Sequence, residues 1–165
     1  MKMGKIEKLF VNNATHSRQV SQHLERLLQH AEIERGQTYL DLGCGNGAAS
    51  IHLAQTYGLM VTGIDVDPEQ IALARAQSAH LPHARFLTID GTQLPFADGE
   101  FNIVATNKVM HHISNWLDAV AEMIRVLKPG GHLIFADIVV HAWLARVGQY
   151  LLKDRLGFPT VATLD

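Results

Sequence analysis

The chain has 165 residues, of which 47% are hydrophobic and 18% charged, and its formal net charge at pH 7 is −2. This length suits one domain with a buried core, and the charge predicts no general attraction for nucleic acid or acidic membranes. A single cysteine, Cys44, excludes an internal disulfide and fits a reducing, cytoplasmic compartment. No secretory signal is evident at the amino end, and charged residues interrupt the apolar stretch 131–152, which argues against a membrane span.

Strands and helices are expected to alternate along the first half of the chain. A first amphipathic helix is predicted over about residues 17–32, followed by a buried strand at 38–42, a helix at 48–57 and a strand at 59–64. Asp67 can cap the next helix, Pro68 suits its first turn, and Gln70 stands where a capping-box partner belongs. That helix is expected to run to about residue 79.

The second half continues the same alternation. Strands are predicted at 84–89 and 101–106, and a helix at 116–127 that the segment Lys128-Pro129-Gly130-Gly131 stops sharply. A nearly all-apolar fifth strand is expected at 132–140. Five strands joined by helices predict an α/β/α sandwich with a mainly parallel sheet. In such sheets, ligands bind at the carboxyl ends of the strands.

The most informative stretch is the loop after the first strand. Gly43, Gly45 and Gly47 alternate there, with Cys44 and Asn46 between them, and helix-forming residues follow at once. Glycine permits positive φ angles and lets a ligand approach the main chain without meeting a Cβ atom. A strand that feeds a tight loop at a helix start is typical of a nucleotide-binding turn. Cys44 is interpreted as a small packing residue of this loop.

Asp41 indicates which kind of ligand the loop holds. It lies inside the buried end of the first strand, two residues before Gly43, where an unpaired carboxylate costs several kcal/mol. A pyrophosphate would gain nothing from this negative charge, whereas a cationic ligand would; the alternative is a structural aspartate that bonds loop amides. Gly43, Gly45 and Ala48 also fit the G-x-G-x-x-A pattern, so an NAD-dependent oxidoreductase stays an alternative.

Two further carboxylates end the next two strands. Asp65 suits the ribose hydroxyls of an adenosine; helix capping is the alternative, which Asp67 can already serve. Asp90-Gly91 can bind adenine through the carboxylate and a backbone amide, or can simply form an Asp-Gly turn. Val66 could lie against one face of the adenine.

Four motifs, at 41–47, 63–65, 89–91 and 127–131, resemble in this order those of the class I S-adenosylmethionine-dependent methyltransferases. The resemblance spans about residues 36–140 and is closest to the small-molecule branch that includes quinone-biosynthesis methyltransferases. It implies a Rossmann-like fold and an enzyme that passes a methyl group from S-adenosylmethionine to a small-molecule acceptor by in-line displacement. A non-catalytic adenosine-binding module is a further alternative.

The resemblance also implies positions for the donor. Asp41 and the loop 43–47 would lie near its methionine part, Asp65 at the ribose and Asp90-Gly91 at the adenine. Asn107 and Val109 would lie beside the sulfonium. No cluster in the sequence has the spacing of metal ligands, so no metal is expected.

His111 and His112 are the candidate bases, should the acceptor have to lose a proton. The alternative is a turn whose rings only pack over the cofactor. In the first helix His16, Arg18 and His23 could face the site from a lid, or belong to a solvated helix face.

A single domain, 1–165, is expected, with a helical lid at 1–35, a core at 36–140 and a helix with a tail at 141–165. The family sheet normally ends in an antiparallel strand pair, for which residues 141–165 leave no room. The pair is therefore expected to be missing or truncated. A fifth strand left at the sheet edge predicts self-association.

Overall fold

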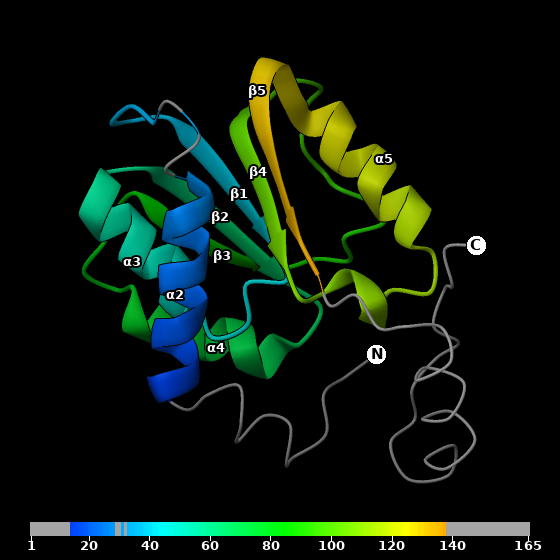
Figure 1. Cartoon of the computed structure of the whole chain (residues 1–165). Helices are drawn as coiled ribbons and strands as arrows, with labels where there is room; N and C mark the ends of the chain where they lie inside the picture. The colour runs from blue at the N-terminus through cyan, green and yellow to red at the C-terminus, as the bar shows by residue number, and fades with distance from the viewer. Residues whose placement is uncertain (1–13, 29–30, 32, 138–165) are drawn as a thin grey trace, which may run out of the picture.

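The computed structural model describes residues 14–28, 31 and 33–137, with side chains described from Val20 onward. Helices and strands alternate as expected, and a parallel sheet forms the centre of the molecule (Figure 1). In chain order the elements are α2 (Ala14–Leu28), β1 (Thr38–Leu42), α3 (Ala48–Tyr57), β2 (Met60–Asp65), α4 (Pro68–Gln77), β3 (Ala84–Thr88), β4 (Phe101–Asn107), the 3₁₀ turn η1 (Met110–His112), α5 (Trp116–Val126) and β5 (Leu127–Ala136). None of the helices in this part of the chain is long and apolar enough to cross a membrane.

The sheet has five strands in the order β3-β2-β1-β4-β5, and all four strand pairs are parallel. Tyr39 of the central strand β1 pairs with Val61 of β2 on one side and Ile103 of β4 on the other. The chain builds β1, β2 and β3 outward in one direction and then returns to place β4 against β1. This change of direction is the switch point at which ligands bind in such sheets. The predicted Rossmann-like fold is confirmed.

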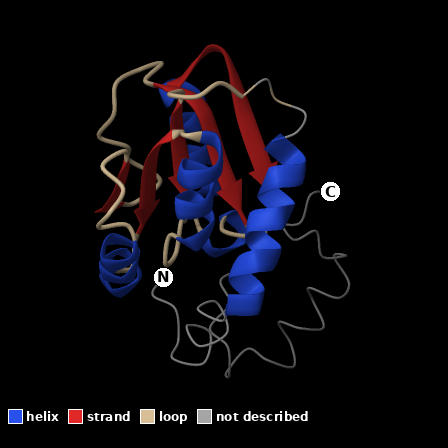
Figure 2. Cartoon of the chain, turned by 90° about the vertical axis from the view of Figure 1, so that its left-hand side faces the viewer, coloured by secondary structure: helices blue, strands red, loops and turns tan. Residues whose placement is uncertain are grey.

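Helices cover both faces of the sheet. Figure 1 shows α2, α3 and α4 on one face and α5 on the other, and Figure 2, seen from the side of α3, shows helices in front of the strands. Successive side chains of β1 point to opposite faces, so Tyr39 packs with Leu24 and Leu53 of α2 and α3, whereas Leu40 belongs to the core that contains Met123 of α5.

The segment Lys128-Pro129-Gly130-Gly131 differs from the prediction. The helix α5 ends at Val126, but the segment lies within β5 instead of preceding it. The register with β4 jumps from Phe101↔Leu127 to Ile103↔His132, so the extra residues form a bulge. Gly130 has a φ of 76°, which residues with a Cβ rarely adopt.

The predicted capping box of α4 is also wrong. Asp67 does cap the helix, since its side chain accepts a hydrogen bond from the Glu69 N–H at 3.0 Å. The Asp67 N–H, however, donates to Asp65 Oδ1 at 2.9 Å and needs no second acceptor. The Gln70 amide is buried and has no hydrogen-bond partner among the described residues.

In the described sheet β5 is the outermost strand on its side. Its Leu133 and Phe135 side chains are 38% and 47% exposed. Residues 138–140 of the predicted fifth strand lie outside the described residues. Residues 141–165, where a helix with a tail was predicted and the antiparallel strand pair was expected to be missing or truncated, also lie outside them. Self-association, and the division into lid, core and tail, therefore stay predictions.

The Tyr39 hydroxyl offers a test of the core. The side chain is fully buried, its hydroxyl has no hydrogen-bond partner among the described residues, and burial raises the pKa of the phenol well above its usual value. Because an unpaired buried hydroxyl costs about 1–3 kcal/mol, we expect Tyr39→Phe to raise the free energy of unfolding by about 1 kcal/mol in urea titrations. Tyr57→Phe, at a half-buried position, is the control and should change the free energy of unfolding little. A clear loss of stability in Tyr39→Phe would show that the Tyr39 hydroxyl forms a hydrogen bond.

Candidate functional site

The glycine loop joins β1 to α3 at the switch point of the sheet. Gly43, Gly45 and Gly47 have φ angles of 81°, 54° and 76°, all in the left-handed region. The Gly43 N–H donates to the Ile64 carbonyl at 2.8 Å, which ties the loop to the end of β2. A Cβ atom at Gly43 would clash with the side chain of Val109, which lies over the loop. Glycine is therefore required at position 43 both by the backbone conformation and by the packing of Val109.

Asp65 bridges this loop and the one after β2. Its Oδ2 accepts a hydrogen bond from the Gly45 N–H at 2.9 Å, and its Oδ1 accepts one from the Asp67 N–H at 2.9 Å. Burial raises the pKa of the Asp65 carboxyl, and these two backbone bonds act against that rise. Each carboxylate oxygen has a second acceptor site, so the side chain can also receive hydroxyl donors from a ligand.

Asp41 faces the first turn of α3. The side chain is 5% exposed and accepts a hydrogen bond from the Ser50 hydroxyl, instead of from the loop amides considered above. Burial raises the pKa of the Asp41 carboxyl to about 6, the Ser50 bond lowers it, and the charge of Asp65 raises it further. The two acidic strand ends are thus electrostatically coupled beneath the glycine loop.

This raised pKa makes a prediction about stability. Between the usual value of 3.8 and about 6 the folded state holds a proton that the unfolded state releases. The contribution of Asp41 to stability is therefore fully present below about pH 4 and is lost as the pH rises through about 6. At one pKa unit per 1.36 kcal/mol, the loss approaches about 3 kcal/mol.

Asp41→Asn keeps an acceptor for Ser50 and removes the titration. Relative to the natural protein, it should gain stability at pH 7 and show no advantage at pH 4. Urea unfolding at both pH values measures this difference. If the substitution changes the free energy of unfolding equally at both pH values, the pKa of the buried Asp41 carboxyl is not raised.

Asp90 and Gly91 form a tight turn after β3. Oδ1 of Asp90 accepts from the Thr92 N–H at 3.0 Å and from the Thr92 hydroxyl at 2.9 Å, and these bonds lower the pKa of the exposed carboxyl. Gly91 is buried, and a Cβ there would come within 3.0 Å of Leu42. The Asp-Gly turn is formed, at the same edge as Asp65. Val66, which follows Asp65, is 42% exposed there.

The carboxyl end of β4 carries two unusual residues. The Asn107 side-chain amide is buried at both its oxygen and its nitrogen, and neither atom has a hydrogen-bond partner among the described residues. Lys108 has a φ of 57°, a strained conformation for a residue with a Cβ, and its N–H donates to the Ala136 carbonyl at 2.7 Å. This turn leads the chain from β4 into η1.

His111 and His112 lie in η1, where Asp137 orders the first of them. Nδ1 of His111 lies 2.6 Å from Asp137 Oδ1, and the His111 N–H donates to Asp137 Oδ2 at 3.2 Å. A carboxylate accepts hydrogen bonds, so Nδ1 carries the proton and Nε2 is the basic nitrogen. The His112 ring packs on His111 with the centroids 3.9 Å apart.

The sequence interpretation missed Asp137, which is one of the charged residues that interrupt the apolar stretch 131–152. The signal was present, because Asp137 directly follows β5, as Asp90 follows the strand β3 within two residues. Which histidine it would contact depended on η1, which has no sequence pattern of its own.

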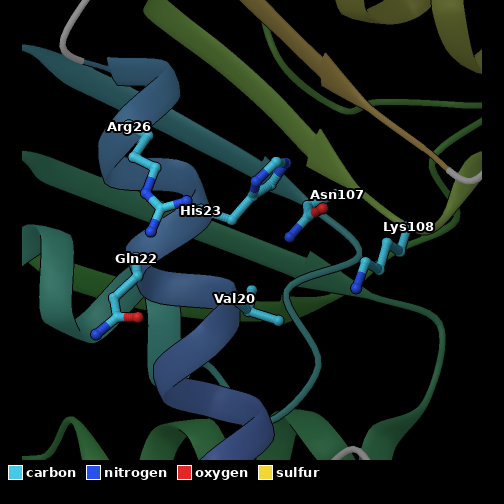
Figure 3. Close-up of a pocket in the computed structure, with 6 residues that line it drawn as sticks. All are labelled: Val20, Gln22, His23, Arg26, Asn107 and Lys108. Atoms are coloured by element: carbon cyan, nitrogen blue, oxygen red, sulfur yellow. The ribbon is translucent and has the colours of Figure 1, made fainter.

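A cavity of about 330 Å³ lies between α2 and the carboxyl end of β4 (Figure 3). The residues that line it are Val20, Gln22, His23, Arg26, Asn107 and Lys108. The helix α2 is anchored by buried Leu24 and by Glu25, whose Oε1 lies 2.7 Å from His52 Nε2 on α3. His23 thus lines a cavity, as the lid hypothesis allowed, while the side chains of His16 and Arg18 lie outside the described residues.

Cys44 fits its interpretation as a packing residue. Burial and the neighbouring carboxylates raise the pKa of its thiol, and its Sγ lies 3.6 Å from the Gly45 carbonyl. Asn46 uses its side-chain oxygen to accept from the Ala48 N–H at 3.2 Å, at the start of α3. Within the described ranges, no group of three or more His, Cys, Asp or Glu residues could hold a metal ion.

Comparison with known proteins identifies the family. A family described as a methyltransferase domain matches residues 40–135, which include the glycine loop, Asp65 and β5. The chain belongs to this methyltransferase family. The resemblance seen in the sequence motifs is confirmed.

Relatives of this chain include a 2-methyl-6-phytyl-1,4-hydroquinone methyltransferase of Synechocystis sp., 34% identical over 138 residues, or 79% of this chain and 43% of that protein. The [4+2]-cyclase SpnF has a similar structure, with a TM-score of 0.66 and 29% identity over 69% of this chain and 43% of that one. A Haemonchus contortus phosphoethanolamine N-methyltransferase in complex with S-adenosyl-L-methionine shares the fold, with a TM-score of 0.67 and 23% identity over 79% of this chain and 32% of that one. The chain spans about half the length of the curated relatives it matches.

Proposed function

We propose that this methyltransferase passes a methyl group from S-adenosylmethionine to a small-molecule acceptor. The observation that carries the proposal is the Asp65 carboxylate, which is held at 2.9 Å from the Gly45 N–H beside a loop of left-handed glycines. The site is acidic at three strand ends, and its glycine loop contains no lysine of the kind that phosphate binders need. Negative charge suits a donor that bears a sulfonium and an ammonium.

The residues at this edge fit such a donor. The loop lacks Cβ atoms at Gly43, Gly45 and Gly47, Asp65 can accept from ribose hydroxyls, and we assign Asp90 and Gly91 to the adenine. Val66 is exposed for contact with the ring, and Val109 lies over Gly43. The two unpaired groups of the Asn107 amide are the natural partners of the donor or acceptor at the reacting end.

When bound, S-adenosylmethionine supplies an activated methyl group, whose C–S bond breaks toward sulfur as the acceptor attacks the carbon. The protein then has to align the two reactants and exclude water, and orientation of this kind is worth about 7–11 kcal/mol. We assign His111 as the base for an acceptor that must lose a proton. Asp137 holds the ring so that Nε2 receives that proton, and the tilted His112 ring packs against it.

Calorimetry tests the donor assignment. S-adenosylhomocysteine should bind the full chain, and NADH should not; the reverse result would favour the dinucleotide alternative. Because the similar structure SpnF is described as a cyclase, binding alone does not establish methyl transfer. Formation of S-adenosylhomocysteine should therefore be followed with substituted hydroquinones, phenols and amines as acceptors. Tight donor binding without turnover on any of them would favour a non-catalytic module.

A further inference from the structure

The cavity between α2 and β4 shares only the carboxyl end of β4 with the proposed donor site. None of its lining residues belongs to the glycine loop or to the ends of β1, β2 and β3. Asn107 is the single residue it shares with the proposed donor contacts. A molecule in this cavity would thus meet the donor only at the carboxyl end of β4, where the methyl group is to be transferred.

The cavity is basic where the donor site is acidic. His23, Arg26 and Lys108 line it, and no carboxylate does. Neither Arg26 nor Lys108 forms an ion pair with another described residue, in contrast to Arg125, which pairs with Asp98 and Glu122 at 2.7 Å. Arg26 and Lys108 are both exposed, and they line one cavity without an ion pair among the described residues. Positive charges repel a sulfonium, so this charge pattern favours an anionic group in the cavity.

The Asn107 amide adds a second, independent observation. Its nitrogen and its oxygen are buried without a partner among the described residues, and an unsatisfied group of this kind costs about 1–3 kcal/mol. Figure 3 shows His23 extending from α2 toward Asn107. The amide nitrogen can donate to an anionic oxygen, and arginine binds a carboxylate through two parallel N–H groups.

We propose that this cavity binds a carboxylate of the methyl acceptor, so that the enzyme selects organic acids as substrates. The inference rests on the proposed function, because it assigns the cavity to the second substrate of that reaction. The carboxylate of the donor itself is the other source of the same chemistry. The lining favours the acceptor, since the glycine loop, which would hold the methionine part of the donor, takes no part in it.

Benzoate and benzamide provide a matched pair of probes that differ in charge. Titrated by calorimetry into the full chain saturated with S-adenosylhomocysteine, at constant ionic strength, benzoate should bind at least tenfold more tightly than benzamide. The double variant Arg26→Gln/Lys108→Gln should weaken benzoate binding at least tenfold and leave the affinity for S-adenosylhomocysteine within about twofold. Arg35→Gln, an exposed arginine outside the cavity, is the matched control and should change neither value.

The outcomes distinguish a carboxylate of the acceptor from the carboxylate of the donor. Equal binding of benzoate by the double variant, or no binding at all, would overturn the proposal. Displacement of benzoate by S-adenosylhomocysteine, together with loss of that ligand in the double variant, would assign the cavity to the donor and also overturn it. Should S-adenosylhomocysteine fail to bind the natural protein, the proposed function fails, while benzoate titration of the free protein still tests the cavity.

Discussion

His111→Ala should lower kcat by about 10²–10⁴-fold, the usual contribution of a general base, while the affinity for S-adenosylhomocysteine stays within about twofold. The expectation follows from the geometry of the pair, in which Asp137 Oδ1 lies 2.6 Å from Nδ1 and leaves Nε2 as the basic nitrogen. Added imidazole should restore part of the activity of His111→Ala, because it supplies the missing base in the vacated space. The measurement is the initial rate of S-adenosylhomocysteine formation with an acceptor that loses a proton.

Asp137→Asn separates positioning from catalysis. Asn keeps the shape of the side chain, but its amide N–H can donate to Nδ1 of His111 and favour the tautomer that carries the proton on Nε2. Because Nε2 is then no longer basic, kcat should fall while KM for the acceptor stays constant. His112→Gln is the matched control on η1 and should have the smaller effect. If His111→Ala instead loses donor affinity and imidazole does not rescue it, the ring packs over the cofactor and is not the base.

Asp65→Ala should weaken S-adenosylhomocysteine binding at least tenfold. A carboxylate that accepts from two ribose hydroxyls makes charged hydrogen bonds, whose loss is worth about 1.5–3 kcal/mol. The same substitution also releases the Gly45 and Asp67 N–H groups, which both donate to this carboxylate at 2.9 Å. Calorimetry measures the affinity, and thermal unfolding without ligand measures the damage to the loop.

Asp65→Asn distinguishes these two effects. It keeps an acceptor for one N–H and loses the charge, so it should retain more stability than Asp65→Ala and still bind the donor weakly. Asp118→Asn, on the exposed first turn of α5, is the control for a lost negative charge. Unchanged affinity in both Asp65 variants would reject the ribose assignment.

Local pattern was sufficient to predict the elements around the glycine loop. The predicted bounds of β1 and α3, at 38–42 and 48–57, are those of the structure, because an apolar run, alternate glycines and helix formers follow one another without ambiguity. The two wrong local predictions have one cause. In both, a contact with another segment replaced the local role that the sequence suggested. Asp65, instead of Gln70, accepts the hydrogen bond from the Asp67 N–H. Pairing with β4 places the segment 128–131 in a bulge of β5, where the sequence suggested a stop after the helix.

The sequence by itself determined the parallel fold, the family motifs and the carboxylates at the ends of the first three strands, because these depend on short-range periodicity and on turn chemistry. Tertiary structure alone decided the contacts between distant segments. It brought Asp137 to His111, 26 residues away, directed Asp41 to Ser50 on α3, and placed Arg26 of α2 and Lys108 on the lining of one cavity. Such contacts follow from strand order and helix packing, which no local pattern in one chain encodes.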